Sequence, residues 1–198
     1  MNNRPAIILY DQCALSEIMD FLLLFDSVNP SFLVAGKHGD SIRTVEGLLL
    51  TVAETISIDA AREHNPVIVA GGDVAAAIDD DTLSEFLREA STQHEAVVGG
   101  ICNGSWLLAR AGLLAGKRCT HTGHASCHAP AEVIATADAL FADAEYVEND
   151  IVVDGRIVTA KPWARSEFAV QLGYLSGLLQ EDQLSAARDY LRGDYTVE

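Results

Sequence analysis

The stretch VVGGICNGSWLLARAGLLAG, residues 97–116, joins a strand pattern to a helix pattern through a turn that contains a cysteine. The first part is β-branched with paired glycines, and the second part has the apolar spacing of a helix. A sharp turn requires small neighbours, which Gly99, Gly100 and Gly104 supply around Cys102. We therefore predict that Cys102 stands on a nucleophile elbow at the carboxyl end of its strand.

The elbow also suggests a chemical state for the thiol. The positive end of the following helix favours a thiolate over a thiol, so we expect Cys102 to be reactive. The alternative is that Cys102 is a small apolar residue buried at a strand end, as most free cysteines are.

Strand and helix patterns alternate on both sides of this stretch. Asp81 is the expected cap of a helix over 80–94, and residues 45–58 read as one or two short strands, as in a hairpin outside the main sheet. The other predicted strands are at 6–10, 31–36, 65–72, 96–102, after 117–123, and on both sides of a turn within 145–160, and the other helices are at 15–28, 104–116, 131–140 and 165–179. This order predicts an α/β fold in three layers, with a mostly parallel sheet between helices, and one domain over residues 1–198.

Composition limits the partners. The net charge of −16 and a pI near 4.5 oppose binding to nucleic acid or to an anionic membrane surface. The sequence shows neither an export signal nor a membrane span, and its four cysteines do not form a disulfide framework. We expect a cytoplasmic protein with free thiols that binds a small molecule.

Four segments together resemble the ThiJ/PfpI family of the class I glutamine amidotransferase-like superfamily. The resemblance covers nearly the whole chain and implies a doubly wound, flavodoxin-like sheet, no cofactor and a homodimer, in which FLLLF or the closing helix offers apolar surface. It rests on ILYDQCALSE (8–17), VIVAGG (67–72), GGICNGSWLLARAGLLAGKRCTH (99–121) and VVDGRIVTAKPWARSEFAVQL (152–172).

The resemblance also assigns roles. Cys102 becomes the nucleophile, and Glu17, from the turn after the first strand, becomes its acid-base partner. The backbone N–H groups of Gly71, Gly72 and Asn103 are expected to stabilise an oxyanion, and His121 to act as a base or proton shuttle. A third triad member is not identified, although Asp73 is a candidate.

The segment HTGHASCH, residues 121–128, allows two further interpretations. Its side chains His121, His124, Cys127 and His128 have the chemistry of zinc ligands but not the spacing of a zinc signature, so we expect no metal. We favour His124 and Cys127 as pocket-lining residues, with Cys127 able to resolve an oxidised Cys102. Trp163 is expected to shape the mouth of the same pocket.

These features define competing functions. The first is a hydratase, lyase or hydrolase in which Cys102 attacks an aldehyde, isocyanide or amide and Glu17 moves the proton. The second is a redox or stress sensor whose thiol is oxidised without turnover. The third, a regulatory domain, lacks an accompanying DNA-binding segment.

Overall fold

The central sheet of the protein is mostly parallel. The computed structural model describes residues 4–36, 41–52 and 54–194. Seven strands form the sheet in the order β12-β13-β9-β7-β1-β3-β6, and only β12 runs antiparallel to its neighbour. Their bounds are β1 Arg4–Leu9, β3 Ser31–Val34, β6 Glu54–Thr55, β7 His64–Val69, β9 Val98–Ile101, β12 Ile151–Asp154 and β13 Ile157–Ala160.

Short strands outside this sheet pair among themselves. β2 lies against β8 and β4 against β5, both antiparallel, while β10 and β11 are parallel. Residues 45–58 contain two short strands, β5 and β6, but these do not pair with each other as a hairpin: β5 pairs with β4, which lies before this range, and β6 joins the edge of the main sheet. The bounds are β2 Cys13–Ala14, β4 Ile42–Arg43, β5 Leu49–Leu50, β8 Gly71–Gly72, β10 Arg118–Cys119 and β11 Glu145–Tyr146.

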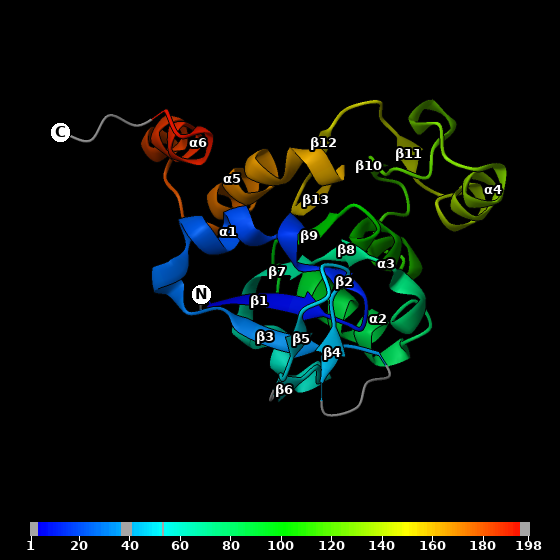
Figure 1. Cartoon of the computed structure of the whole chain (residues 1–198), viewed down its shortest axis with the longest axis horizontal. Coiled ribbons are helices and arrows are strands. Elements are labelled where there is room, and N and C mark those ends of the chain that lie inside the picture. The colour runs from blue at the N-terminus through cyan, green and yellow to red at the C-terminus, as the bar shows by residue number, and fades with distance from the viewer. Residues whose placement is uncertain (1–3, 37–40, 53, 195–198) are drawn as a thin grey trace.

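Helices cover both faces of the sheet. In Figure 1, α1, α5 and α6 lie on one side of it and α2 and α3 on the other, while α4 lies beside β10 and β11. The central strands β1, β7 and β9 are almost completely buried, as expected of parallel strands covered on both faces. The helices are α1 Met19–Leu24, α2 Asp81–Arg88, α3 Gly104–Arg110, α4 Ala131–Leu140, α5 Arg165–Ser176 and α6 Leu184–Arg192.

The layered α/β fold is therefore as predicted, and the differences are local. The helix expected over 15–28 is broken into a 3₁₀ turn at Leu15–Glu17, α1 and a second 3₁₀ turn. The cap of α2 is Asp80 rather than Asp81, because the Asp80 carboxylate accepts the N–H groups of Thr82 and Leu83. None of the described helices is long and apolar enough to cross a membrane.

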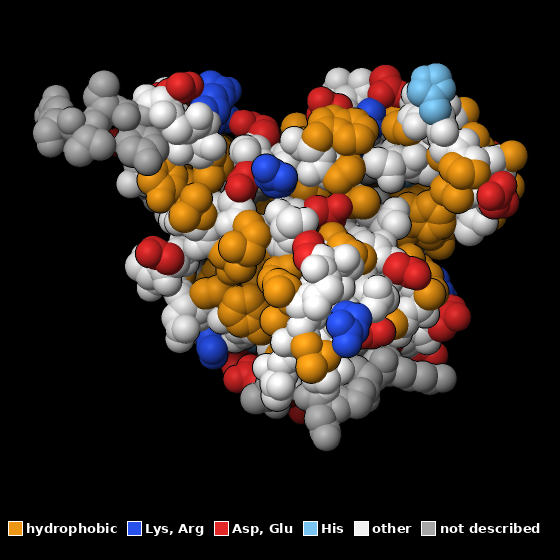
Figure 2. All heavy atoms as spheres, in the orientation of Figure 1, with side chains coloured by type: hydrophobic (Ala, Val, Ile, Leu, Met, Phe, Trp, Pro, Cys, Tyr) orange, Lys and Arg blue, Asp and Glu red, His pale blue; other side chains and the backbone are white. Residues whose placement is uncertain are grey.

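One face carries an apolar groove. Figure 2 shows hydrophobic side chains gathered between α1 and the β3–β5 region. Met19 and Leu23 of α1 are 47% and 53% exposed, and Phe32 of β3 is 37% exposed. The groove has a volume of about 570 Å³, and its apolar lining includes Leu9, Leu15, Met19, Leu22, Phe32, Leu50 and Val52.

Candidate active site

Cys102 occupies a strained turn between β9 and α3. Its φ angle is +53°, a left-handed conformation that residues other than glycine rarely adopt. Its backbone N–H donates to the carbonyl of Ala160 at 2.8 Å, and its carbonyl accepts the Ser105 hydroxyl at 2.7 Å. Residue 104, two positions after Cys102, must be a glycine, because a Cβ on residue 104 would lie 2.4 Å from the carbonyl oxygen of Val69. The elbow geometry therefore holds the half-buried thiol at the carboxyl edge of the sheet.

Glu17 is brought to the same edge by the turn that follows β1. The carboxylate of Glu46 accepts the N–H groups of Leu15 at 3.3 Å and Ser16 at 2.8 Å, which fixes the 3₁₀ turn ending at Glu17. Although burial acts to raise the pKa of Glu46, hydrogen bonds from Ser16, Thr44 and its own backbone lower it to about 2, so Glu46 is ionised near neutral pH. The role of Glu46 is not visible in the sequence, because this residue lies about 30 residues from the turn that it holds.

The Glu17 carboxyl lies between Gly71 and Cys102. Its Oε2 accepts the N–H of Gly71 at 3.1 Å, and the carboxyl also hydrogen-bonds the Cys102 side chain. A Cβ on Gly71 would lie 2.1 Å from Oε2 of Glu17 and 2.6 Å from Cβ of Cys102. Residue 71 must therefore lack a side chain for the acid to reach the thiol.

The pKa of Glu17 and the pKa of Cys102 depend on each other. Burial raises the pKa of Glu17 to about 7, while its hydrogen bonds to Cys102 and Gly71 oppose the rise. Burial and the negative charge of Glu17 raise the pKa of Cys102 to about 12. The expected thiolate is thus not the resting form beside an ionised Glu17, because two negative charges at this distance repel. Protonation of Glu17 removes this repulsion and makes the thiolate less unfavourable, although burial still opposes it.

The three backbone amides predicted to stabilise an oxyanion, those of Gly71, Gly72 and Asn103, do not all point to the Cys102 sulfur. The amides of Asn103 and Gly72 hydrogen-bond the Cys102 sulfur and act to lower its pKa, whereas the Gly71 amide is engaged by Glu17. The Asn103 side chain donates to the Gly72 carbonyl at 2.8 Å, which joins the two turns. Two amides therefore converge where negative charge would develop beside the sulfur.

Tyr10 forms the buried floor of this site. Its hydroxyl donates to the carbonyls of Ala70 and Gly71 at 2.8 and 2.7 Å. Burial raises its pKa well above the ordinary value, and the charges of Cys13, Glu17 and Cys102 raise it further. Tyr10 is a neutral donor that fixes the turn after β7, a role the sequence does not reveal.

His121 lies in an aromatic cluster with Phe141 and Tyr146. Its ring stacks on Phe141 with centroids 3.9 Å apart and meets the edge of Tyr146 at 5.1 Å. Burial lowers its pKa to about 4, and the charge of His124 lowers it further, so the ring is neutral. Within the described part of the chain, no hydrogen bond joins His121 to Cys102 or Glu17, and its Nδ1 has no protein partner.

Two of the other predicted pocket residues, His124 and Cys127, contact that cluster. His124 stacks on Tyr146 at 3.7 Å, and the Cys127 thiol donates to the His121 carbonyl at 3.7 Å. Groups of three or more side chains able to hold a metal are not found among the described residues. Asp73 caps the following 3₁₀ turn through the N–H of Ala75, and Trp163 is 60% exposed.

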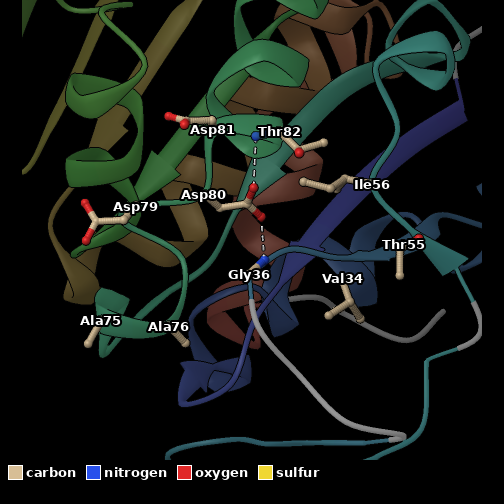
Figure 3. A pocket seen from close by; sticks show the side chains of 10 residues that line it. All are labelled: Val34, Gly36, Thr55, Ile56, Ala75, Ala76, Asp79, Asp80, Asp81 and Thr82. Atoms are coloured by element: carbon tan, nitrogen blue, oxygen red, sulfur yellow. Dashed lines mark hydrogen bonds between the residues drawn. The ribbon is translucent and has the colours of Figure 1, made fainter.

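A cavity of about 510 Å³ lies at the carboxyl ends of β3 and β6, away from the thiol. Figure 3 shows the Asp80 carboxylate bridging the N–H groups of Gly36 and Thr82, while Asp79 points away from these two residues. The polar wall of this cavity is thus the cap of α2, and neither Cys102 nor Glu17 lines it.

Comparisons with known proteins agree with this architecture. The model of the DJ-1/PfpI family matches residues 3–173. No curated protein gives a significant match. Solved structures with the same fold include DJ-1 of Schizosaccharomyces pombe, with a TM-score of 0.76 and 16% identity over 95% of this chain and 98% of that one.

Two further structures resemble the chain over almost their full lengths. A DJ-1 superfamily protein from Agrobacterium tumefaciens has a TM-score of 0.75 and 21% identity, over 98% of this chain and 100% of that one. A structure described as an AraC family transcriptional regulator from Pseudomonas putida has a TM-score of 0.72 and 21% identity, over 96% and 99%. At these identities the likeness concerns the fold.

Proposed function

This chain belongs to the DJ-1/PfpI family, and we propose that it is an enzyme in which Cys102 attacks a small electrophilic substrate. The substrate is an aldehyde, isocyanide or amide, and the reaction is of the hydratase, lyase or hydrolase type. The observation that carries the proposal is the Glu17 carboxyl between the Gly71 amide and the Cys102 side chain. That position suits an acid-base partner because the proton of the thiol has an acceptor within hydrogen-bond reach.

The geometry supports the following sequence for an aldehyde. The thiol proton moves to Glu17 as the sulfur attacks the carbonyl carbon, so that a carbon–sulfur bond forms while the carbonyl electron pair moves to oxygen. The amides of Gly72 and Asn103 stabilise the oxyanion. Glu17 then returns its proton to that oxygen. Because Glu17 has a pKa of about 7, it can both accept and donate this proton near neutral pH.

His121 is proposed to act as an additional base or proton shuttle. Its neutral ring and unpartnered Nδ1 suit a base or proton shuttle, but a substrate or water must connect it to the thiol. Cys127, His124 and Trp163 are proposed to line the pocket at this end.

Turnover of a panel of small electrophiles tests the proposal. Wild type should convert at least one aldehyde, isocyanide or amide steadily, and Cys102→Ser should abolish that conversion. If every reagent reacts only once per chain, the enzyme proposal fails and the second candidate is favoured.

That candidate is a redox sensor without turnover. It is favoured by the same contact, because a protonated Glu17 can donate a hydrogen bond to an oxidised sulfur. Peroxide should then add oxygen atoms to Cys102 stoichiometrically, as measured by mass spectrometry of the peptide, and Glu17→Ala should destabilise the oxidised product. Oxidation that falls on Cys127 instead would contradict the sensor.

We also propose that residues 1–198 act as one domain, in the cytoplasm, without a cofactor, and as a homodimer. The apolar groove beside α1 supports the dimer, because exposed apolar surface of this extent favours pairing. The acidic charge disfavours nucleic acid and anionic membranes as partners.

A further inference from the structure

Lys161 leaves the sheet beside Cys102. Ala160, the last residue of β13, pairs in register with Ile101 of β9, and its carbonyl accepts the Cys102 N–H at 2.8 Å. The next residues, Lys161 and Cys102, therefore start from neighbouring strand ends, which lie about 4.8 Å apart. The Lys161 side chain thus begins at the same edge of the sheet as the Cys102 side chain.

The ammonium group is buried but only partly satisfied. The Lys161 side chain is 4% exposed, and its Nζ donates to Oε1 of Glu148 at 2.6 Å. The Asp150 carboxylate is 4.0 Å away, beyond hydrogen-bond distance. An ammonium group has three N–H donors, and the bond to Glu148 is the one that Nζ makes within the described residues. Two donors of this buried cation consequently have no hydrogen-bond acceptor among the described residues.

Glu148 fixes this cation in place. Its other oxygen accepts the Tyr146 hydroxyl at 2.9 Å and also the Ser126 hydroxyl. The hydrogen bond from Lys161, together with these two, lowers the pKa of Glu148 to about 2, so that the carboxylate remains charged. For Lys161, burial acts to lower the pKa, but the contact with Glu148 outweighs it and raises the pKa.

The position of Nζ is close to the surface of the protein. The Trp163 ring is 60% exposed, and its centroid lies 5.7 Å from Nζ. Glu148 and Asp150 are 57% and 61% exposed. Solvent therefore reaches the Trp163 ring and the two carboxylates, while the ammonium group lies buried beside them.

We propose that Lys161 is a specificity-determining residue that binds a carboxylate group of the substrate while Cys102 attacks its electrophilic carbon. This inference rests on the proposed nucleophilic role of Cys102 and names the substrate class as anionic electrophiles. A carboxylate has two oxygens, which match the two unused donors of Nζ. A local cation is needed for such a substrate, because the net charge of −16 otherwise repels anions.

A matched pair of thiol reagents tests the inference without requiring turnover. N-propylmaleimide is neutral, whereas 3-maleimidopropionate has a similar length and carries a carboxylate. Their rates with Cys102 are measured by peptide mass spectrometry in a Cys127→Ser background, with β-mercaptoethanol as the reference thiol. We expect wild type to favour the carboxylated reagent by about fivefold more than the reference does.

Variants assign the preference to Lys161. Lys161→Met should reduce it to the reference value while changing the rate of the neutral reagent less than about twofold, and Lys161→Arg should retain most of it. The matched control is Lys117→Met, which removes a lysine that is paired with Asp154 and is 36% exposed, and it should leave the preference unchanged. Glu148→Gln removes a competing charge and should increase the preference.

Three outcomes overturn the inference: no preference in wild type, an equal preference in Lys161→Met, or an equal loss in Lys117→Met. If Lys161→Met does not fold, a decrease rather than an increase in Glu148→Gln has the same force. Failure of the proposed function is distinguishable, because turnover would then be absent from wild type whether or not the reagent preference is present.

Discussion

A methyl group on Gly71 would lie 2.1 Å from Oε2 of Glu17, so these two residues fit together only because residue 71 has no side chain. The carboxyl of Glu17 fills the space that a side chain at residue 71 would take. The contact between acid and thiol therefore depends on a residue that contributes no functional group.

Gly71→Ala should separate Glu17 from Cys102 without unfolding the protein. We expect turnover to fall by about a hundredfold, which is the size of a lost acid-base contribution. The measurement is kcat with the best substrate from the panel, with circular dichroism to verify folding. The double variant Gly71→Ala/Glu17→Ala should lose more than Glu17→Ala alone, because the added Cβ also lies 2.6 Å from Cβ of Cys102, but less than the two single losses combined; fully additive losses would show that the two residues act separately.

Glu17 should make the protein less stable as the pH rises. Burial raises its pKa from 4.5 to about 7, so the folded state favours the protonated form. The stability that this group contributes is fully present below about pH 4.5 and is lost as the pH rises through about 7. After allowance for partial exposure, the loss is about 2 kcal/mol.

Glu17→Gln tests this sign, because glutamine is neutral at every pH. In urea denaturation the variant should gain about 2 kcal/mol relative to wild type between pH 4.5 and pH 8. An unchanged difference between the two proteins over this range would contradict the raised pKa.

The same substitution should make the thiol easier to ionise. Burial and the charge of Glu17 raise the pKa of Cys102, so removal of that charge lowers it. Glu17→Gln should therefore react with iodoacetamide at Cys102 about ten times faster at pH 8 while losing turnover, since the acid-base group is gone. Cys127 in the same sample serves as the internal control, and unchanged or slower labelling of Cys102 would contradict a thiol pKa raised by the charge of Glu17.

Dimer formation should depend on the groove beside α1. Met19→Glu places a charge on exposed apolar surface of the groove and should convert the dimer into a monomer in multi-angle light scattering at micromolar concentration. Ile58→Glu, at an exposed apolar residue that is not among the groove's lining residues, is the matched control and should leave the mass unchanged. A monomeric wild type would end this proposal.

The fold was predictable because parallel strands covered on both faces are continuously apolar and alternate with helices. Residues 131–140 form a helix with the predicted bounds, and the turn at Asp154 and Gly155 joins two strands as expected. The cap of α2 was misassigned by one residue, since three successive aspartates offer the same chemistry and the contact with Gly36 selects Asp80. Such a contact is invisible in the local sequence.

The site was predictable only in part, for a similar reason. The glycines around Cys102 indicate a tight turn, but the resting protonation of its thiol depends on the distance to Glu17, which is 85 residues away in sequence. The contacts of Tyr10, Glu46 and Lys161 likewise join distant segments through hydrogen bonds that no spacing rule predicts. The catalytic roles of Glu17 and His121 stay predictions.

The left-handed backbone at Cys102 lowers the stability of the folded protein, although the reactive side chain is needed at this position for the proposed chemistry. A residue with a side chain costs roughly 1 kcal/mol in that conformation, and a glycine would relieve most of it. A Cys102→Gly variant would thus have a larger free energy of unfolding than the native protein. The native protein therefore keeps its reactive sulfur together with permanent backbone strain at the end of the central strand β9.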